Sequence, residues 1–409
     1  MNPTPKNHDL VLVGGGHTHA LLIRRLGMKP IPGVRVTLVS ENRLTPYSGM
    51  LPGLVAGHYD AAETHIDLNQ LCQRAGVHFI EGRLDGLDPE RQTLSIEDQP
   101  RLSYDVVSLD TGSTPNLDLP GAHEHAVGVK PVSHFHATWQ AMLRDSQANT
   151  EPQHWGVVGA GAGGVELVLA IAHRLRQQQH IRLHLFYSGQ QPLQGYPDGV
   201  VRAAQDALTA AGVNSHSAFK VAKVTASGVS SHIGAQITLD KTLLVTPASA
   251  PDWPVVAGLD TANGGFVAVN KFLQSTSHPT VFAAGDVAEM INDPRPKAGV
   301  YAVRQAPTLY HNLRAYFAEA PMRPLRLQKQ FLSLLSLGSQ RATGSRNRLT
   351  VTGGWVWRWK DKIDRDFMAR FNDFRPSDMS APKDDTTPVV MHCAGCGSKL
   401  GPALLQDTL

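Results

Sequence analysis

Apolar residues along this chain fall into short β-branched runs, each followed by a glycine-rich turn and a helical pattern. The first unit of this kind predicts a buried strand at 9–13, a helix at 20–26 and a second strand at 34–39. A second unit begins at Trp155, and its second strand is predicted at 181–187. Short apolar runs that alternate with helices are typical of β-α-β units with a parallel sheet. The pattern therefore predicts an α/β fold.

A glycine-rich turn joins the first strand to the helix in both units. Gly14 and Gly16 match the first two glycines of G-x-G-x-x-G, whereas His19 stands at the third position. The second unit carries the complete pattern in Gly159, Gly161 and Gly164. In dinucleotide sites these glycines make the tight turn, let backbone approach a pyrophosphate and pack the helix on the strand. By itself, the first motif fits either such a site or an ordinary glycine turn.

A third stretch, Thr280 to Asp286, reads as a strand that ends in the small residues Ala283, Ala284 and Gly285. Small residues let backbone come close to a ligand, and the carboxylate of Asp286 can bind hydroxyl groups. One dinucleotide fold inserted in another, and closed by such a strand, is the layout of flavoproteins that bind two dinucleotides.

On these motifs the chain resembles the FAD-dependent pyridine nucleotide-disulfide oxidoreductases, and among them the type II NADH dehydrogenases. The resemblance covers about residues 8–320 and also rests on Tyr104-Asp105 and the segment 111–115. It implies two Rossmann-like dinucleotide-binding domains, with the NAD(P) domain inserted in the FAD domain, and a small C-terminal α+β unit. The expected boundaries are 8–152 and 246–320 for the FAD domain, 153–245 for the NAD(P) domain and 321–374 for the C-terminal subdomain.

The resemblance also implies site residues. FAD would contact the residues Gly14, Gly16, Thr111, Gly112, Gly285, Asp286, Lys297 and Ala298, with Asp286 at the ribityl chain. NADH or NADPH would contact Gly159, Gly161 and Gly164. The strand predicted at 181–187 ends without an acid, so the choice between NADH and NADPH stays open, as does a degenerate nucleotide site.

Two acids have a functional and a structural interpretation. Glu41, just after the second strand, is the candidate ligand of a ribose of FAD; the alternative is a solvated surface charge. By resemblance, Glu166 lies near the nicotinamide and the flavin as the catalytic residue. The alternative for Glu166 is an acid near a helix start that the helix dipole stabilises.

The cysteines argue against thiol chemistry. Related disulfide reductases carry a redox cysteine pair in the Pro- and Gly-rich stretch 43–57, which reads as a loop here and holds none. Cys72 stands alone on a helix predicted at 67–75. We therefore expect transfer of a hydride from NAD(P)H to FAD, and of electrons to a quinone or another small acceptor. The alternatives are a sulfide:quinone oxidoreductase-like enzyme and a flavin-binding module that regulates or delivers to a partner without turnover.

Composition and segment character bear on the protein's partners and on its place in the cell. The chain has 409 residues and a net charge of +3, too small to indicate a nucleic-acid partner. No secretory signal is visible in residues 1–8, and no apolar run approaches the ~20 residues of a membrane span. Three cysteines fit a reducing cytoplasm. A Trp-bearing basic amphipathic helix, predicted from Trp355 to Phe371, fits either peripheral contact with the inner face of a membrane or packing on the flavin domain or another subunit.

The last part of the sequence has a different character. A linker rich in Pro, Ser, Asp and Thr is predicted at 375–388, and it precedes the segment 389–409. The spacing of Cys393 and Cys396 alone would fit half a zinc site or a redox pair. The order Gly395-Cys396-Gly397-Ser398-Lys399 instead resembles the start of selenophosphate synthetase (selenide, water dikinase), where the residues matching Cys396 and Lys399 are catalytic. We therefore expect the oxidoreductase half of a fusion with that synthetase, linked to selenium metabolism.

Overall fold

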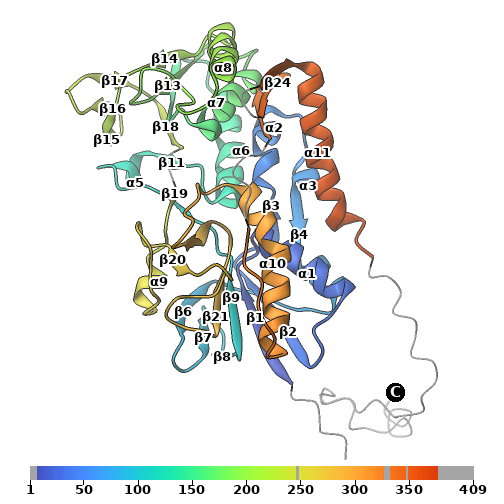
Figure 1. The fold of residues 1–409 in the computed structure, drawn as a ribbon. Coiled ribbons are helices and arrows are strands. Elements are labelled where there is room, and N and C mark those ends of the chain that lie inside the picture. The colour runs from blue at the N-terminus through green and yellow to red at the C-terminus, as the bar shows by residue number, and fades with distance from the viewer. Residues whose placement is uncertain (1–6, 246–247, 327–331, 347–348, 376–409) are drawn as a thin grey trace, which may run out of the picture. The chain divides into compact units, whose positions relative to one another are not determined.

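The computed structural model describes residues 7–245, 248–326, 332–346 and 349–375 (Figure 1). The described residues up to Phe374 form one compact unit, to which all the elements below belong. Two parallel sheets dominate this unit, and each has its own hydrophobic core.

The first sheet has five parallel strands in the order β21-β9-β1-β2-β5. Their bounds are β21 Val281–Ala283, β9 Val106–Leu109, β1 His8–Val13, β2 Val34–Ser40 and β5 His78–Glu81. Three helices accompany it: α1 (His17–Met28) contacts both α4 (Leu68–Ala75) and α10 (Gly299–Phe317). A strand buried on both faces reads as a continuous apolar run, which is why the buried part of β1 is apolar throughout and β9 is apolar except for Ser108.

The second sheet has the same parallel architecture, in the order β11-β18-β12-β13-β14. Its bounds are β11 Val127–Gly128, β18 Lys241–Leu244, β12 Gln153–Val158, β13 Ile181–Phe186 and β14 Asn214–His216, with helices α6 (Val132–Ala148), α7 (Ala162–Arg174) and α8 (Asp198–Ala210). The predicted α/β class and both β-α-β units are therefore confirmed.

Each parallel sheet is accompanied by a small antiparallel sheet. The one in the first half comprises β6 (Leu84–Asp88), β7 (Thr93–Ile96) and β8 (Leu102–Ser103); the one in the second comprises β15 (Val221–Thr225), β16 (Gly228–Ser231) and β17 (Gln236–Thr238). Short elements complete the unit: α3 Ala61–Thr64, β4 His65–Asp67, β10 Thr114–Pro115, α5 Ala122–His125, β19 Ala248–Ser249, α9 Trp253–Val256, β20 Val267–Val269, η2 Gly285–Val287 and β22 Ala288–Met290.

The C-terminal part of the unit is an antiparallel sheet followed by a long helix. Strands β23 (Ser333–Leu337), β24 (Ser339–Arg346) and β25 (Leu349–Gly353) lead into α11 (Gly354–Asn372). Strand β23 packs on α7, and α11 contacts α3 and β4 on the other half of the molecule (Figure 1). The helix predicted from Trp355 to Phe371 is confirmed as α11, and the three strands before it give the C-terminal part the expected α+β character.

The stretch 43–57 is not the loop that its prolines and glycines predict. It forms β3 (Leu44–Pro46), the short 3₁₀ helix η1 (Ser48–Met50) and α2 (Leu51–Ala56). Pro52 lies in the first turn of α2, where the absence of its N–H costs nothing, and Gly57 ends the helix with φ of 81°. These residues act as helix start and stop signals.

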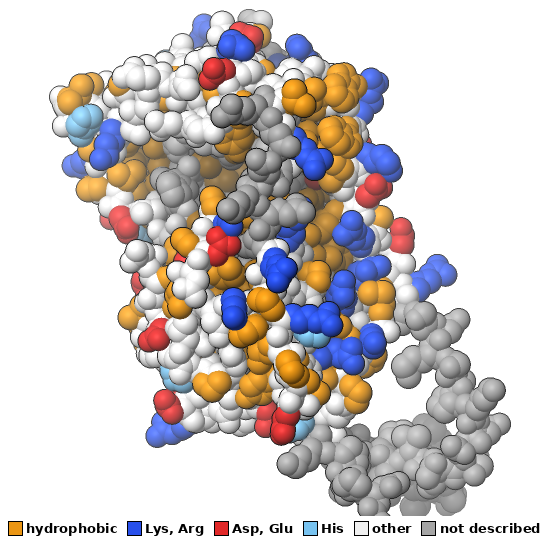
Figure 2. All heavy atoms as spheres, in the orientation of Figure 1, with side chains coloured by type: hydrophobic (Ala, Val, Ile, Leu, Met, Phe, Trp, Pro, Cys, Tyr) orange, Lys and Arg blue, Asp and Glu red, His pale blue; other side chains and the backbone are white. Residues whose placement is uncertain are grey.

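The large apolar side chains at the C-terminal end of α11 are buried, whereas several in its N-terminal half are exposed. Phe367 and Phe371 are buried, and the Phe367 ring stacks on Tyr47 with centroids 4.4 Å apart. Trp355, Trp359 and Ile363 stay exposed, at 52%, 42% and 40% of their full surface. The C-terminal half of α11 therefore packs on the part of the chain expected to bind FAD, which is one of the two alternatives that the sequence left open for this helix. Figure 2 shows basic and hydrophobic side chains along the side of the molecule where α11 lies.

We predict that Phe367→Ala loosens this docking. The substitution removes a side chain that is 5% exposed, and such core truncations lower the free energy of unfolding by about 3 kcal/mol. Urea unfolding with FAD in excess measures the change. Trp359→Ala, on the exposed half of the same helix, is the matched control and should cost less than about 1 kcal/mol. Equal losses for the two variants would contradict the docking described here.

Candidate active site

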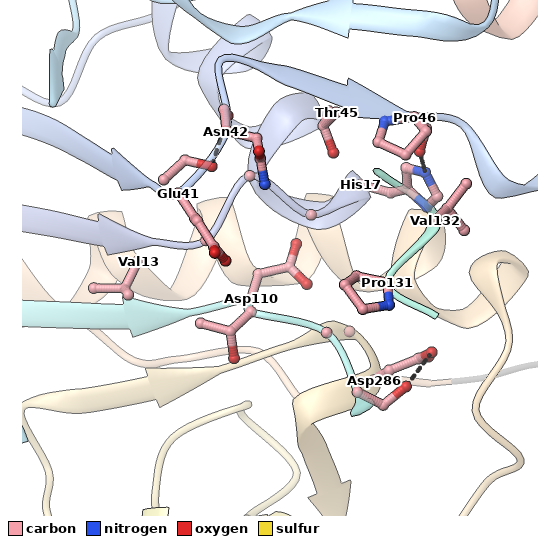
Figure 3. A pocket seen from close by; sticks show the side chains of 18 of the residues that line it. Val13, His17, Glu41, Asn42, Thr45, Pro46, Asp110, Pro131, Val132 and Asp286 are labelled. Atoms are coloured by element: carbon pink, nitrogen blue, oxygen red, sulfur yellow. Dashed lines mark hydrogen bonds between the residues drawn. The ribbon is translucent and has the colours of Figure 1, made fainter. Parts of the chain in front are cut away.

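A cavity of about 520 Å³ opens at the C-terminal ends of β1, β2 and β9 (Figure 3). Its wall contains the turn 14–16, the strand ends Glu41 and Asp110, and Asp286 of η2. Ligands of open parallel sheets bind at this edge, and the volume lies within the usual range for small-molecule sites. The site thus occupies the position that the first glycine motif predicts.

The glycines of this cavity have no room for a side chain. A Cβ atom on Gly14, whose φ is 93°, would lie 2.4 Å from the Asp110 carbonyl oxygen. One on Gly16 would lie 2.4 Å from the Asp110 carboxyl group, and one on Gly285 would lie 2.1 Å from its Oδ1. Bare backbone therefore surrounds the N-terminus of α1, where free N–H groups favour an anion. This cradle fits the diphosphate of a dinucleotide.

His19, which replaces the third glycine, has a structural role. Its Nδ1 lies 2.8 Å from the Gly14 carbonyl oxygen, and its Nε2 lies 2.9 Å from Ser108 Oγ. In the second motif a Cβ on Gly164 would lie 1.8 Å from the Gly159 oxygen, so that helix packs directly on its turn. In the first motif the imidazole ring takes the place of this close contact. Burial lowers the pKa of His19 to about 4, so the ring is neutral at physiological pH.

Asp110 is a site residue that the sequence reasoning missed. It follows β9, is 3% exposed, and its backbone N–H donates to the Val13 carbonyl oxygen. Its Oδ2 accepts a hydrogen bond of 3.0 Å from the backbone N–H of His19, in the first turn of α1. Burial raises the pKa of Asp110 well above its ordinary value, and the nearby charge of Asp286 adds to the rise. The available signal was an acid directly after the apolar run of β9.

Asp286 lies in the cavity wall, as the resemblance implied, and it has partners that the sequence did not reveal. Lys130 Nζ lies 3.0 Å from its Oδ2, and Ser113 Oγ donates to the same oxygen at 3.3 Å. Thr111 and Gly112 line the same cavity. The ion pair fixes the orientation of the Asp286 carboxylate.

The remaining residues assigned to FAD divide into two groups. Glu41 lines the cavity and is exposed, so its role as a ribose ligand remains a prediction. Lys297 and Ala298 line a smaller hollow on the other side of Gly285 and Asp286. There, Lys297 Nζ donates to the Ala288 carbonyl oxygen at 2.6 Å and pairs with Glu289. Gly299 and Ala302, rather than Lys297 and Ala298, line the main cavity.

The second glycine motif forms the turn between β12 and α7. Gly159 has φ of 110°, and nothing lies within 4 Å of a Cβ built on Gly161. Together with the close packing of Gly164 on Gly159, this leaves open, bare backbone at the start of α7 and fits a second diphosphate. The three predicted glycines thus come together.

Glu166 lies beyond the first turn of α7 and faces the C-terminal sheet. Its Oε1 accepts a hydrogen bond of 2.7 Å from the Ser336 backbone N–H. Burial raises the pKa of Glu166 to about 7, while the charge of Lys360 opposes the rise. Lys360 itself donates to Asp364 at 2.6 Å and to the Gly49 carbonyl oxygen at 2.7 Å. Glu166 is therefore a largely buried acid held among α7, β23 and α11, and not a solvated charge at a helix start.

Comparisons with known proteins agree with this geometry. Residues 8–306 match the sequence profile described as pyridine nucleotide-disulphide oxidoreductase. The chain belongs to this family. It is therefore an oxidoreductase that uses FAD and NAD(P)H.

Individual relatives span most of the chain. Demethylphylloquinone reductase NdbB of Synechocystis is 25% identical over 361 residues, covering 84% of this chain and 88% of the relative. The sulfide:quinone oxidoreductase structure from Aquifex aeolicus covers 90% of this chain and 92% of its own, with a TM-score of 0.75 and 18% identity. NDH2 of Plasmodium falciparum in complex with NADH covers 88% of this chain and 98% of its own, with a TM-score of 0.71 and 13% identity. The two structures show a shared fold.

Thiol chemistry finds no support in the described residues. Cys72 is the one cysteine among them; it is fully buried, and burial raises its pKa to about 12. Cys393, Cys396 and Lys399, the residues of the synthetase-like segment, lie outside the described part of the chain. Among the described helices, none combines the length and apolar character needed to cross a bilayer.

We predict that Asp286→Ala lowers the FAD content of the purified protein at least tenfold. The change removes the carboxylate assigned to the ribityl chain and leaves Lys130 without its 3.0 Å partner in the cavity wall. Flavin absorbance per chain measures the effect. Asp206→Ala, at an exposed position of α8, is the control. A folded Asp286→Ala protein with full flavin occupancy would refute the assignment.

The raised pKa of Glu166 predicts a pH-dependent stability difference. A carboxyl group with a folded-state pKa of about 7 resists ionisation in the folded protein, so its contribution falls as pH rises from 4.5 through 7. Glu166→Gln can still accept the Ser336 hydrogen bond and cannot ionise. Relative to wild type, the free energy of unfolding of Glu166→Gln should therefore rise by about 3 kcal/mol between pH 4.5 and pH 9.

Urea unfolding of both proteins at the two pH values measures this gain. Glu124→Gln, at an exposed position, is the control for the loss of a surface charge. A Glu166→Gln protein that parallels wild type at both pH values would show that Glu166 is solvated like a surface acid.

Proposed function

We propose that this enzyme is an NAD(P)H:quinone oxidoreductase, which passes electrons from NADH or NADPH through FAD to a quinone or another small acceptor. The observation that carries the proposal is the pair of glycine cradles, at the starts of α1 and α7, within one compact unit. The similarity to a demethylphylloquinone reductase over 84% of the chain supports a quinone as acceptor.

The chain's own residues would bind and orient both cofactors. When bound, FAD supplies the chemistry, because it accepts a hydride from the reduced nicotinamide and passes on the electrons. The turn 14–16 and the start of α1 would hold its diphosphate, and Asp286, oriented by Lys130, its ribityl hydroxyls. The turn 159–161 and the start of α7 would hold the nicotinamide nucleotide. A Ser188 at the end of β13, in place of an acid, is compatible with either NADH or NADPH.

By resemblance Glu166 lies near the nicotinamide and the flavin, where it would act on the charge that develops during hydride transfer and would also hold a proton for the acceptor. A carboxyl group with a pKa of about 7 is present in both protonation states at physiological pH. Reduction of a quinone to a quinol consumes two protons, and a group of this kind can hold one and be replenished. Lys360 and Asp364, which are both largely buried on α11, set the local charge around it.

The exposed half of α11 supports a cytoplasmic enzyme that touches the inner face of a membrane peripherally. Trp355, Trp359 and Ile363 are exposed there, and the basic residues Arg358 and Lys362 lie between them in sequence. Aromatic rings partition into the headgroup region, and basic side chains favour anionic lipids. Membrane quinones would then be within reach of the protein.

Two further proposals rest on separate observations. A sulfide:quinone oxidoreductase-like activity is favoured by the shared fold, but the inert Cys72 argues against a cysteine mechanism. The resemblance of residues 389–409 to the start of selenophosphate synthetase supports a fusion with that synthetase and a link to selenium metabolism. The non-enzymatic alternative, a flavin-binding module of such a fusion, is tested by the experiment below.

We predict that anaerobic NADH or NADPH bleaches the bound flavin rapidly and that a water-soluble quinone restores its colour. Glu166→Gln should lower the limiting rate of reduction about tenfold and change the half-saturating nucleotide concentration less than about threefold. The reason is that the glycine turn carries the binding, while the carboxyl group acts on charge that develops in the transition state.

Stopped-flow absorbance over a range of nucleotide concentrations separates the two parameters. A wild-type flavin that stays oxidised would establish the non-enzymatic module instead. An unchanged limiting rate in Glu166→Gln would assign Glu166 a structural role.

A further inference from the structure

The wall of the FAD cavity contains a surplus of negative charge. Three acids line it, Glu41, Asp110 and Asp286. Of these, Asp110 is the most deeply placed, because its carboxyl group packs directly against the α-carbons of Gly16 and Gly285 and against the first turn of α1. This is the same helix start at which an anionic diphosphate is expected to bind.

The cationic side chains that line the cavity form ion pairs with carboxylates other than that of Asp110. Among the described residues that line it, Arg83 and Lys130 carry a permanent positive charge. Arg83 makes two hydrogen bonds of 3.0 Å to Glu97, and Lys130 pairs with Asp286 at 3.0 Å. Within the described structure, neither Arg83 nor Lys130 forms an ion pair with Asp110. An ionised Asp110 beside a diphosphate would therefore place like charges together in a buried site without a balancing cation.

We propose that Asp110 is a ligand of FAD in its neutral form: one carboxyl oxygen accepts from the start of α1, and the protonated oxygen donates a hydrogen bond to the diphosphate. The proposal rests on FAD binding at the first glycine motif and is independent of the electron acceptor. A neutral carboxyl group at this position turns a repulsive contact into a hydrogen bond to an anion, which is a strong class of hydrogen bond.

A pH dependence follows from this assignment. Wherever free protein carries an ionised Asp110, FAD binding must take up a proton, and affinity falls about tenfold per pH unit. The other titratable groups that face Asp110 are His17 and His19 on α1, Asp286 on η2, Lys130 before α6 and Glu41 after β2. The pKa values of both histidines are lowered by burial, so they stay neutral above pH 7.

The deciding test is infrared spectroscopy of the FAD-loaded protein at pH 7.5. The difference spectrum, wild type minus Asp110→Asn, should contain the C=O stretching band of a carboxylic acid, which is distinct from the bands of a carboxylate. Any acid band of Glu166 cancels in this difference, because both proteins contain that residue. Asparagine matches the shape of the neutral acid and can donate the same hydrogen bond, so Asp110→Asn should bind FAD within about threefold of wild type at pH 7.

Titration of the deflavinated proteins with FAD between pH 7 and pH 9 gives the second readout. Any loss of affinity in wild type with rising pH should be absent in Asp110→Asn and retained in Glu41→Gln, which removes an exposed acid from the same cavity. A flat wild-type profile together with the acid band means that Asp110 is neutral without FAD as well, and supports the proposal. Absence of the acid band, or an Asp110→Asn protein with the slope of wild type, would overturn it.

Discussion

The close approach of three backbone segments at one edge of the first sheet is the constraint on which this structure depends. The turn after β1, the end of β9 and the turn after β21 are far apart in the sequence. They meet so closely that a single Cβ atom on Gly14, Gly16 or Gly285 would collide with Asp110. This contact sets the floor of the FAD cavity and fixes the start of α1 with respect to the sheet.

The C-terminal part connects the two nucleotide-binding halves. Strand β23 holds Glu166 of α7 through the Ser336 N–H, and α11 reaches the first half through the Phe367 ring on Tyr47 and through Lys360 on Gly49. Buried charges such as Lys360 and Asp364 are costly unless they are paired, and here they pair with each other. Burial raises the pKa of Glu166, and Ser336 and Lys360, which limit this rise, both belong to the C-terminal part; Ser336 lies 170 positions away in the chain.

Local patterns made the parallel sheets, both glycine turns and the C-terminal helix predictable, because strand runs and glycine spacing are set by neighbours in sequence. The helix α2 was missed because Pro52 and Gly57 serve equally well in loops. Asp110, Lys130 and Ser113 were missed for another reason. Their roles arise from contacts across 91, 156 and 173 positions of sequence, which no local pattern reveals. His19 was visible as a departure from the motif, but its hydrogen bonds to Gly14 and Ser108 required the fold.

The central claim is that the nucleotide bound at the second glycine motif reduces the flavin bound at the first directly. A primary deuterium isotope effect on flavin reduction tests it most sharply, with NADH carrying deuterium at one or the other face of nicotinamide C4. The account predicts slower anaerobic bleaching with one of the two labelled nucleotides and an unchanged rate with the other, because a single bound orientation presents one face to the flavin. Equal limiting rates at saturating concentration for both labelled nucleotides and for unlabelled NADH would contradict direct transfer within this chain.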